Sequence, residues 1–167
     1  MARNRDFVAR LFAAVDSVQG GDGISIILWN SRGEIMKLAE YFENTRGTAV
    51  FATADANGRV DSAIYSHPHC LADGILGFVM ADKRSHRNLL TNGQAAYLFI
   101  EEGDDYRGVR LQLDLVEETS DPELVNKYHR HPAKNCELPV SDTIYFVTFK
   151  VKEVRELVGD DDPGFTL

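Results

Sequence analysis

The sequence predicts a mainly β fold, a small antiparallel barrel of six or seven strands with a few short helices. Three observations lead to this prediction. Between residues 47 and 113, apolar segments of six to eight residues alternate with turn residues, as in neighbouring antiparallel strands. A further alternating segment covers residues 143–151. Helical periodicity is confined to short stretches between these segments, which argues against a doubly wound sheet.

The predicted strands have clear boundary signals. Asp55-Ala-Asn-Gly58 places Asn-Gly at a tight reversal, where positive backbone dihedrals are needed, and so predicts a hairpin. A short helix is expected to start near Ser85, with Ser85 as its cap. The predicted strands are 48–54, 59–65, 75–81, 95–100, 106–113 and 143–151.

The helical stretches divide the chain into parts. The spacing of apolar residues predicts helices over residues 4–18 and 34–46, the second ending at Gly47. Ser120 or Asp121 can cap a third helix that runs to about residue 129, before a loop over 130–141. We therefore expect an N-terminal arm over 1–33, with a strand or extended segment at 24–29, a barrel domain over 34–158 and a mobile acidic tail over 159–167.

Composition and charge limit the classes of function. The chain has 167 residues, 44% of them hydrophobic and 26% charged, which is typical of one soluble globular domain. A net charge of -8 argues against a general nucleic-acid surface. Two cysteines, Cys70 and Cys136, do not make a disulfide framework, so we expect a reducing, cytoplasmic setting. Arg10 interrupts the N-terminal apolar run, and we expect neither a signal peptide nor a membrane span.

The segment from Lys83 to Arg87 is the strongest candidate for binding chemistry. Lys83, Arg84 and Arg87 stand there with no acidic residue among them, which in an acidic protein suits a small anion better than a polymer. Because the segment joins a strand end to a helix start, free backbone N–H groups and the helix dipole add to the attraction. A solvated basic turn is the alternative interpretation, and this segment alone does not decide between the two.

Two other positions, Arg59 and Gly108, become candidate site residues only through what lies next to them in the fold. Arg59 opens the second strand and joins the anion site only if that strand lies beside Lys83. Gly108 interrupts a predicted strand, which indicates either a close approach by a ligand or a β-bulge.

The sequence His67-Pro-His69-Cys70 invites a metal interpretation, with His131 or Cys136 as further ligands. No second clustered pair of ligands follows, so we expect no metal site. Signatures of a nucleophile elbow, a phosphate-binding loop or a dinucleotide fingerprint are not present in the sequence.

Taken together, these segments resemble the pyridoxamine 5′-phosphate oxidase-like, FMN-binding split-barrel family over about residues 34–155. The resemblance rests on the helix from Glu34, the hairpin Thr48–Asp61 and the run Phe78–Asn92. The segments 94–101 and 106–110 are similar to a subgroup with no assigned substrate. This resemblance implies a split barrel of the FMN-binding type and a homodimer with two FMN sites at the subunit interface.

The resemblance also implies roles for matching positions in this chain. The backbone of residues 59–62 would line the flavin ring, and residues 80–82 would flank the ring and the ribityl chain. Residues 83–86 would hold the phosphate with Asn88 near it, and residues 107–108 would come from the partner subunit or the facing strand. The implied cofactor-binding residues are Arg59, Val60, Asp61, Ser62, Met80, Ala81, Asp82, Lys83, Arg84, Ser85, His86, Asn88, Arg107 and Gly108.

One part of the family pattern is missing. Pyridoxamine phosphate oxidases carry Arg and His residues for the substrate phosphate in an Arg-rich terminal strand. Here the chain ends in the acidic run Gly159-Asp-Asp-Asp-Pro163, which would repel a phosphorylated substrate. Vitamin B6 oxidation is therefore not expected.

We expect an FMN-dependent oxidoreductase that acts on an unidentified small molecule. Since no residue stands out as an acid or base, the flavin itself would do the chemistry. Three alternatives stay open: a flavin-binding or electron-transfer protein without its own substrate, a deazaflavin protein, and a haem-binding or haem-degrading protein. In the haem protein the axial ligand would be His67, His69 or His131.

Overall fold

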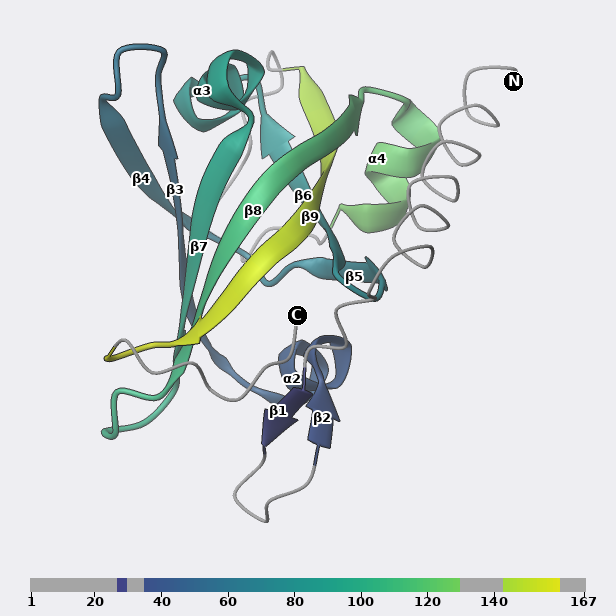
Figure 1. Cartoon of the computed structure of the whole chain (residues 1–167). Helices are drawn as coiled ribbons and strands as arrows, with labels where there is room; N and C mark the ends of the chain where they lie inside the picture. Colours follow the sequence, from purple (N-terminus) through teal and green to yellow (C-terminus); the bar gives the residue numbers. More distant parts are fainter. Residues whose placement is uncertain (1–26, 30–34, 130–142, 160–167) are drawn as a thin grey trace.

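A computed structural model of the chain describes residues 27–29, 35–129 and 143–159, which form one strongly curved antiparallel sheet with short helices at its ends and side (Figure 1). The sheet has seven strands in the order β4-β3-β7-β8-β9-β6-β5, and a separate pair is formed by β1 and β2. The mainly β prediction is therefore confirmed. The elements are β1 (Ile27–Trp29), β2 (Ile35–Lys37), α2 (Leu38–Asn44), β3 (Gly47–Ala54), β4 (Val60–Tyr65), β5 (His69–Ala72), β6 (Ile75–Ala81), α3 (Arg84–Asn92), β7 (Gln94–Glu101), β8 (Gly108–Thr119), α4 (Pro122–Tyr128) and β9 (Ile144–Glu156).

The sheet closes on itself as a barrel. Three strands separate β3 from β6 in the sheet order. In a flat sheet these two strands would lie roughly 19 Å apart. Instead the rings of Phe51 on β3 and Phe78 on β6 are 5.2 Å apart, and both contact Phe149 on β9. Register shifts in the long strands β8 and β9, at Gln112/Leu113 and Leu115/Glu117, accompany the bend.

The barrel interior follows the two-residue period of its strands. On β3 the buried side chains are Ala49, Phe51 and Thr53, and the residues between them are partly exposed. Tyr97 and Phe99 continue this buried row on β7, so that a mainly aromatic core fills the barrel.

Three helices lie outside the barrel wall in the described part of the chain. In Figure 1, α3 lies at the upper end beside β3 and β4, and α2 lies at the lower end. α4 covers the outer side of β6 and β9, where Leu124 and Val125 pack on Phe146. Asp121 caps α4 by accepting hydrogen bonds from the N–H groups of residues 123 and 124, so one of the two predicted caps is confirmed.

Several predicted boundaries were wrong. Residues 35–37 are not helical but form β2, because they pair with β1, and the helix begins only at Leu38. Ser85 does not cap α3: Lys83 holds the cap position in an extended conformation, and Ser85 lies inside the first turn. The short strand β5 was not predicted, since Pro68 and two histidines interrupt its apolar pattern.

Some predictions lie outside the described residues. These are the helix over 4–18, the loop over 130–141 with His131 and Cys136, and the tail beyond residue 159. In the described ranges, no helix has the length and apolar character needed to cross a membrane.

Candidate functional site

The start of α3 presents a cluster of hydrogen-bond donors at the upper end of the barrel. The first helical bond runs from the N–H of Arg87 to the carbonyl of Lys83. The N–H groups of residues 84–86 therefore precede the first intrahelical bond, and the side chain at the cap position, Lys83, forms no capping bond with them in the described part of the chain. Because the positive end of the helix dipole lies at this point, the first turn of α3 attracts an anion.

Three cationic side chains surround this turn, and all are exposed. Arg84 is 77% exposed, and its Nη1 lies 3.2 Å from Asp61 Oδ1 on β4. Arg87 donates to Asp82 through Nε at 3.3 Å. Lys83 is exposed at the cap position. The Arg84–Asp61 contact shows that β4 lies beside the Lys83 segment, which is the condition predicted from the sequence for Arg59 to join the site. Exposed ion pairs contribute roughly 0.2–1 kcal/mol, so an incoming anion competes easily with the carboxylate.

Two hydroxyl groups extend the donor cluster. Ser85 is buried in the first turn of α3, and its side chain lies near that of Tyr65 on β4. Burial raises the pKa of Tyr65, the nearby Ser85 lowers it by a smaller amount, and Asp61 raises it further. The phenol therefore stays protonated at neutral pH. Tyr65 was not predicted, although it shares one face of β4 with Asp61 because strand residues alternate.

Asparagines fasten α3 to β3. Asn88 is buried and donates from Nδ2 to Thr53 Oγ1 at 3.0 Å. Asn92 donates to the carbonyl of Ala54 at 2.8 Å. The described contact of Asn88 is thus an anchor for the helix, which holds the first turn of α3 in place.

His86 has a buried side chain, although its position in the sequence implied a phosphate ligand. The side chain is 2% exposed, and Nε2 lies 2.6 Å from Glu118 Oε2 on β8. A phosphate at the start of α3 would meet the backbone N–H of His86 and not its ring. The sequence pattern does not indicate this contact, because Glu118 lies 32 residues away along the chain.

The remaining ring-lining candidates are placed as follows. Val60 is 75% exposed at the start of β4. β4 pairs with β3 alone among the described strands, so its other edge offers backbone N–H and C=O groups. Ala81 is half-buried at the end of β6, whereas the side chain of Met80 belongs to the barrel core.

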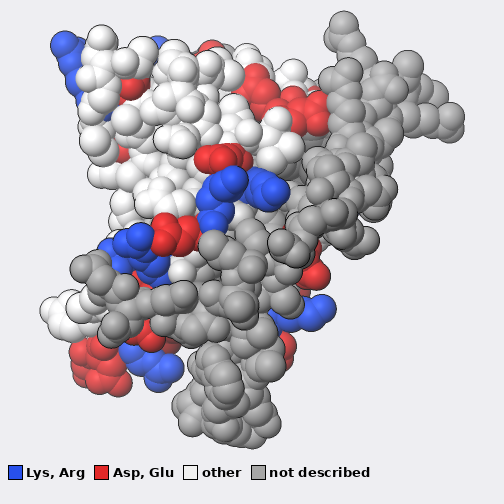
Figure 2. All heavy atoms as spheres, in the orientation of Figure 1, with Lys and Arg blue, Asp and Glu red and all other residues white. Residues whose placement is uncertain are grey.

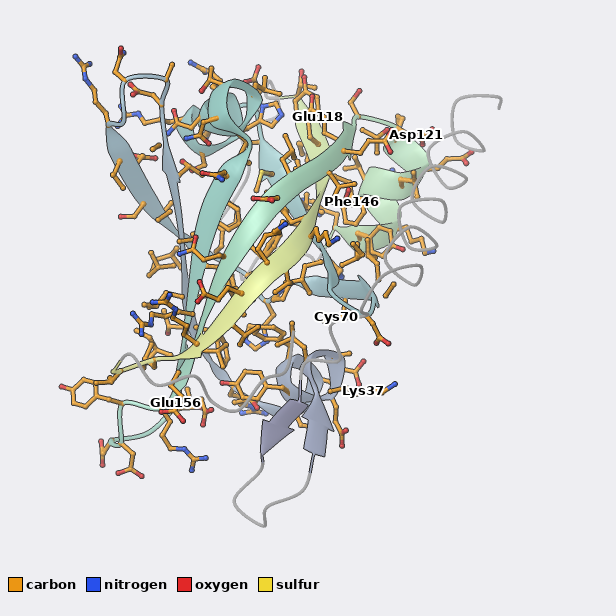
Figure 3. The ribbon with its side chains drawn as sticks, in the orientation of Figure 1. Lys37, Cys70, Glu118, Asp121, Phe146 and Glu156 are labelled. Carbon is orange, nitrogen blue, oxygen red and sulfur yellow. The ribbon has the colours of Figure 1, made fainter. Side chains whose placement is uncertain are left out.

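Arg107 and Gly108 lie at the other end of β7 and β8. Figure 3 labels Glu156, which pairs with Val109, at the lower end of β9, whereas Glu118 lies at the upper end of β8. Within one chain these two residues therefore do not reach α3. Gly108 has φ of 147°, and a Cβ there would lie 2.0 Å from the carbonyl oxygen of Phe99. The close neighbour of Gly108 is thus the backbone of its own hairpin.

The histidines considered for metal or haem lie elsewhere. His67, His69 and Cys70 line a cavity of about 420 Å³ between α2, β5 and the end of α4. His67 Nδ1 lies 3.2 Å from the carbonyl oxygen of Phe42. Within residues 37–129 and 143–159, no three His, Cys, Asp or Glu side chains are arranged to hold a metal ion.

Solved structures share this fold. No protein-family model matches the sequence, and no curated protein sequence matches it either. An FMN-binding protein from Syntrophomonas wolfei subsp. wolfei is similar with a TM-score of 0.59 and 15% identity, over 74% of this chain and 85% of that chain. An F420 reductase has a TM-score of 0.54 and 16% identity, over 72% and 98%. HupZ of Group A Streptococcus has a TM-score of 0.55 and 17% identity, over 72% and 90%. At such identities the likeness shows the fold, and it confirms the split barrel that the sequence predicted.

Proposed function

We propose that this chain binds FMN with the phosphate at the start of α3, and that it is an FMN-dependent oxidoreductase acting on a small molecule. The observation that carries the proposal is the donor cluster at that turn. Backbone N–H groups that precede the first intrahelical bond lie there beside the exposed cations Lys83 and Arg84. A phosphate monoester is nearly a dianion at pH 7 with three acceptor oxygens, and it needs several such charge-assisted donors. The fold shared with an FMN-binding protein supports the choice of cofactor.

The residues present fit the parts of the cofactor. Lys83, Arg84 and the first turn of α3 would hold the phosphate, and Ser85 with the protonated Tyr65 would complete its hydrogen bonds. The exposed edge of β4 would offer backbone groups to the polar edge of the flavin ring. When bound, the flavin supplies the electron-transfer chemistry, and the chain binds and orients it.

A homodimer is part of the proposal, because one face of the sheet is apolar and uncovered by the described residues. Ile64 on β4 is 71% exposed, and it shares a row with Val50 on β3 and Leu98 on β7. Ala52 and Ala96 form the neighbouring row. Figure 2 shows a broad area over β3, β4 and β7 with few charged side chains. A second copy of the chain would bury this face, as an isologous interface requires.

Such a dimer would also give Arg107 a place in the site. If the two-fold axis runs across the strands, the lower end of one sheet meets the upper end of the other. The Arg107 end of the partner would then lie at the α3 end of this chain. Ile64→Asp should shift the protein to a monomer in light scattering and weaken FMN binding; a dimer that persists in this variant would remove the β3–β4–β7 face from the interface.

The phosphate site is tested by comparing FMN with riboflavin, which lacks the phosphate. Each charge-assisted contact contributes about 1.5–3 kcal/mol to the binding free energy when it is buried, and about 1 kcal/mol when its groups are exposed. Lys83→Ala combined with Arg84→Ala should therefore weaken FMN binding about 30-fold and leave riboflavin binding unchanged. Lys127→Ala, an exposed cation on α4, is the matched control. Equal losses for both ligands, or no loss, would contradict the phosphate assignment.

A further inference from the structure

The ring of His86 ties the first turn of α3 to three other elements. Its Nε2 lies 2.6 Å from Glu118 Oε2 at the upper end of β8, where Figure 3 labels Glu118. The ring stacks on Tyr145 of β9, with centroids 4.2 Å apart and planes 16° from parallel. Its Nδ1 faces Asp82 Oδ1, in the β6–α3 connection, at 3.6 Å. His86 is thus a buried junction behind the turn that would hold the phosphate.

The two ring nitrogens face different hydrogen-bonding situations. The bond to Glu118 has the short length of a charge-assisted contact. Nδ1 is buried and has no hydrogen-bond partner among the described residues, although the Asp82 carboxylate lies near it. A neutral ring that donates from Nε2 turns a lone pair of Nδ1 toward this carboxylate. A doubly protonated ring directs an N–H toward each carboxylate, so this arrangement of acceptors matches the imidazolium.

The Asp82 carboxylate lies between the buried ring of His86 and the exposed side chain of Arg87. Its Oδ1 accepts from Arg87 Nε at 3.3 Å, and its carbonyl accepts from Arg87 Nη2 at 3.3 Å. Its N–H donates to the carbonyl of Thr143, just before β9. Movement of Asp82 toward or away from the ring therefore moves the residue that leads into Lys83 and the helix start. The charged and titratable groups around the ring are Asp82, Glu118, Tyr145 and, through Asp82, Arg87.

We infer that His86 is a positioning residue for the phosphate site: its doubly protonated ring, held between Asp82 and Glu118, fixes the first turn of α3 and adds positive charge behind it. This inference rests on the proposed FMN site and assigns His86 a role different from direct contact with the phosphate. When the second proton leaves, Nδ1 and the Asp82 carboxylate repel each other and the buried positive charge is lost. FMN affinity therefore falls when a rise in pH removes the second proton.

The test compares FMN dissociation constants of the wild-type protein and His86→Gln between pH 5.5 and 8.5. The phosphate of FMN itself gains charge near pH 6. That effect is the same for both proteins, so the ratio of their dissociation constants isolates the histidine. At pH 6 the variant should bind roughly three- to tenfold more weakly, as expected for one lost charge near the ligand at an intermediate dielectric. The ratio should move toward one as pH rises. Glu118→Gln, which removes one of the two carboxylates but can still accept the hydrogen bond, should move the change to lower pH.

His129→Gln, at the end of α4, is the control and should give a ratio of one at every pH. A His86→Gln ratio that stays constant with pH, at one or at any other value, would overturn the inference. A second readout needs no flavin: amide resonances of residues 84–87 in the cofactor-free protein should shift with pH in the wild type and stay still in His86→Gln. If FMN does not bind at all, the proposed function fails, but these resonances still test whether the His86 ring positions the first turn of α3. Resonances with equal pH dependence in both proteins would contradict that role.

Discussion

Replacing Asp61 by Asn should strengthen FMN binding, because Asp61 competes with the phosphate for Arg84. The carboxylate Oδ1 lies 3.2 Å from Arg84 Nη1, and the two side chains are 23% and 77% exposed. Asn keeps the size of the side chain and removes its charge. Arg84 is then free to turn to the phosphate, and a negative charge beside the cofactor is lost.

The size of the effect follows from the exposure of the pair. An exposed ion pair contributes roughly 0.2–1 kcal/mol, which Asp61→Asn makes available to the phosphate. Removing the repulsion between carboxylate and phosphate in a solvated site adds a few tenths of a kcal/mol, roughly. A total near 1 kcal/mol corresponds to about fivefold tighter binding. The gain should shrink at high salt, since salt screens both contributions.

The assay is titration of cofactor-free protein with FMN, followed by quenching of flavin fluorescence. Glu153→Gln is the control, because Glu153 also forms a surface pair, with Arg155 at 2.6 Å on β9. Most of the gain should vanish when Arg84→Ala is added to Asp61→Asn, since the freed guanidinium is then absent and only the smaller gain from removed repulsion remains. Weaker FMN binding by Asp61→Asn alone would refute the reasoning and would make Asp61 a direct cofactor ligand.

Two further predictions concern stability. Gly108→Ala should lower the free energy of unfolding by about 3 kcal/mol or more in urea titrations. The reason is that Gly108 has a φ of 147° and an added Cβ would lie 2.0 Å from the Phe99 carbonyl oxygen. Gly58→Ala should lower the free energy of unfolding less, because Gly58 has a φ of 77° and no atom lies within 4 Å of the added carbon. Burial raises the pKa of both Tyr41 and Tyr65 above the usual value of about 10, so the unfolded chain releases protons first and stability should fall as pH rises above about 10. Tyr41→Phe and Tyr65→Phe should each flatten this alkaline slope, and an unchanged slope would contradict the cause assigned to it.

Six of the seven strands in the described sheet were predicted from the sequence because each has a local signal, whereas β5 was not. The segment 75–81 is continuous and apolar, and Asn57-Gly58 marks the turn between β3 and β4 through a positive φ at Gly58. The helix at residues 34–46 was predicted too long, since the pairing of residues 35–37 with residues 27–29 is a contact between two segments. Helical spacing does not reveal such pairing.

In the candidate site, too, local features were predicted from the sequence and contacts between distant segments were not. Lys83 and Arg84 were found because charge and the strand–helix junction are adjacent in sequence. Tyr65 could have been found by following alternate residues along β4 from Asp61. The partner of His86 could not, because Glu118 reaches it only after the barrel closes. Burial of the ring, and hence its separation from the phosphate, is a property of the folded chain.

The proposal that this split barrel binds FMN is tested by the absorbance spectrum of the freshly purified protein, followed by heat release and mass identification of any cofactor. Flavin absorbance bands with released FMN are expected, or binding of added FMN by colourless protein. A Soret band would show the haem alternative, and released deazaflavin would replace FMN as the cofactor. A colourless protein that does not bind added FMN would contradict the proposal and leave Lys83–Arg87 as a solvated basic turn.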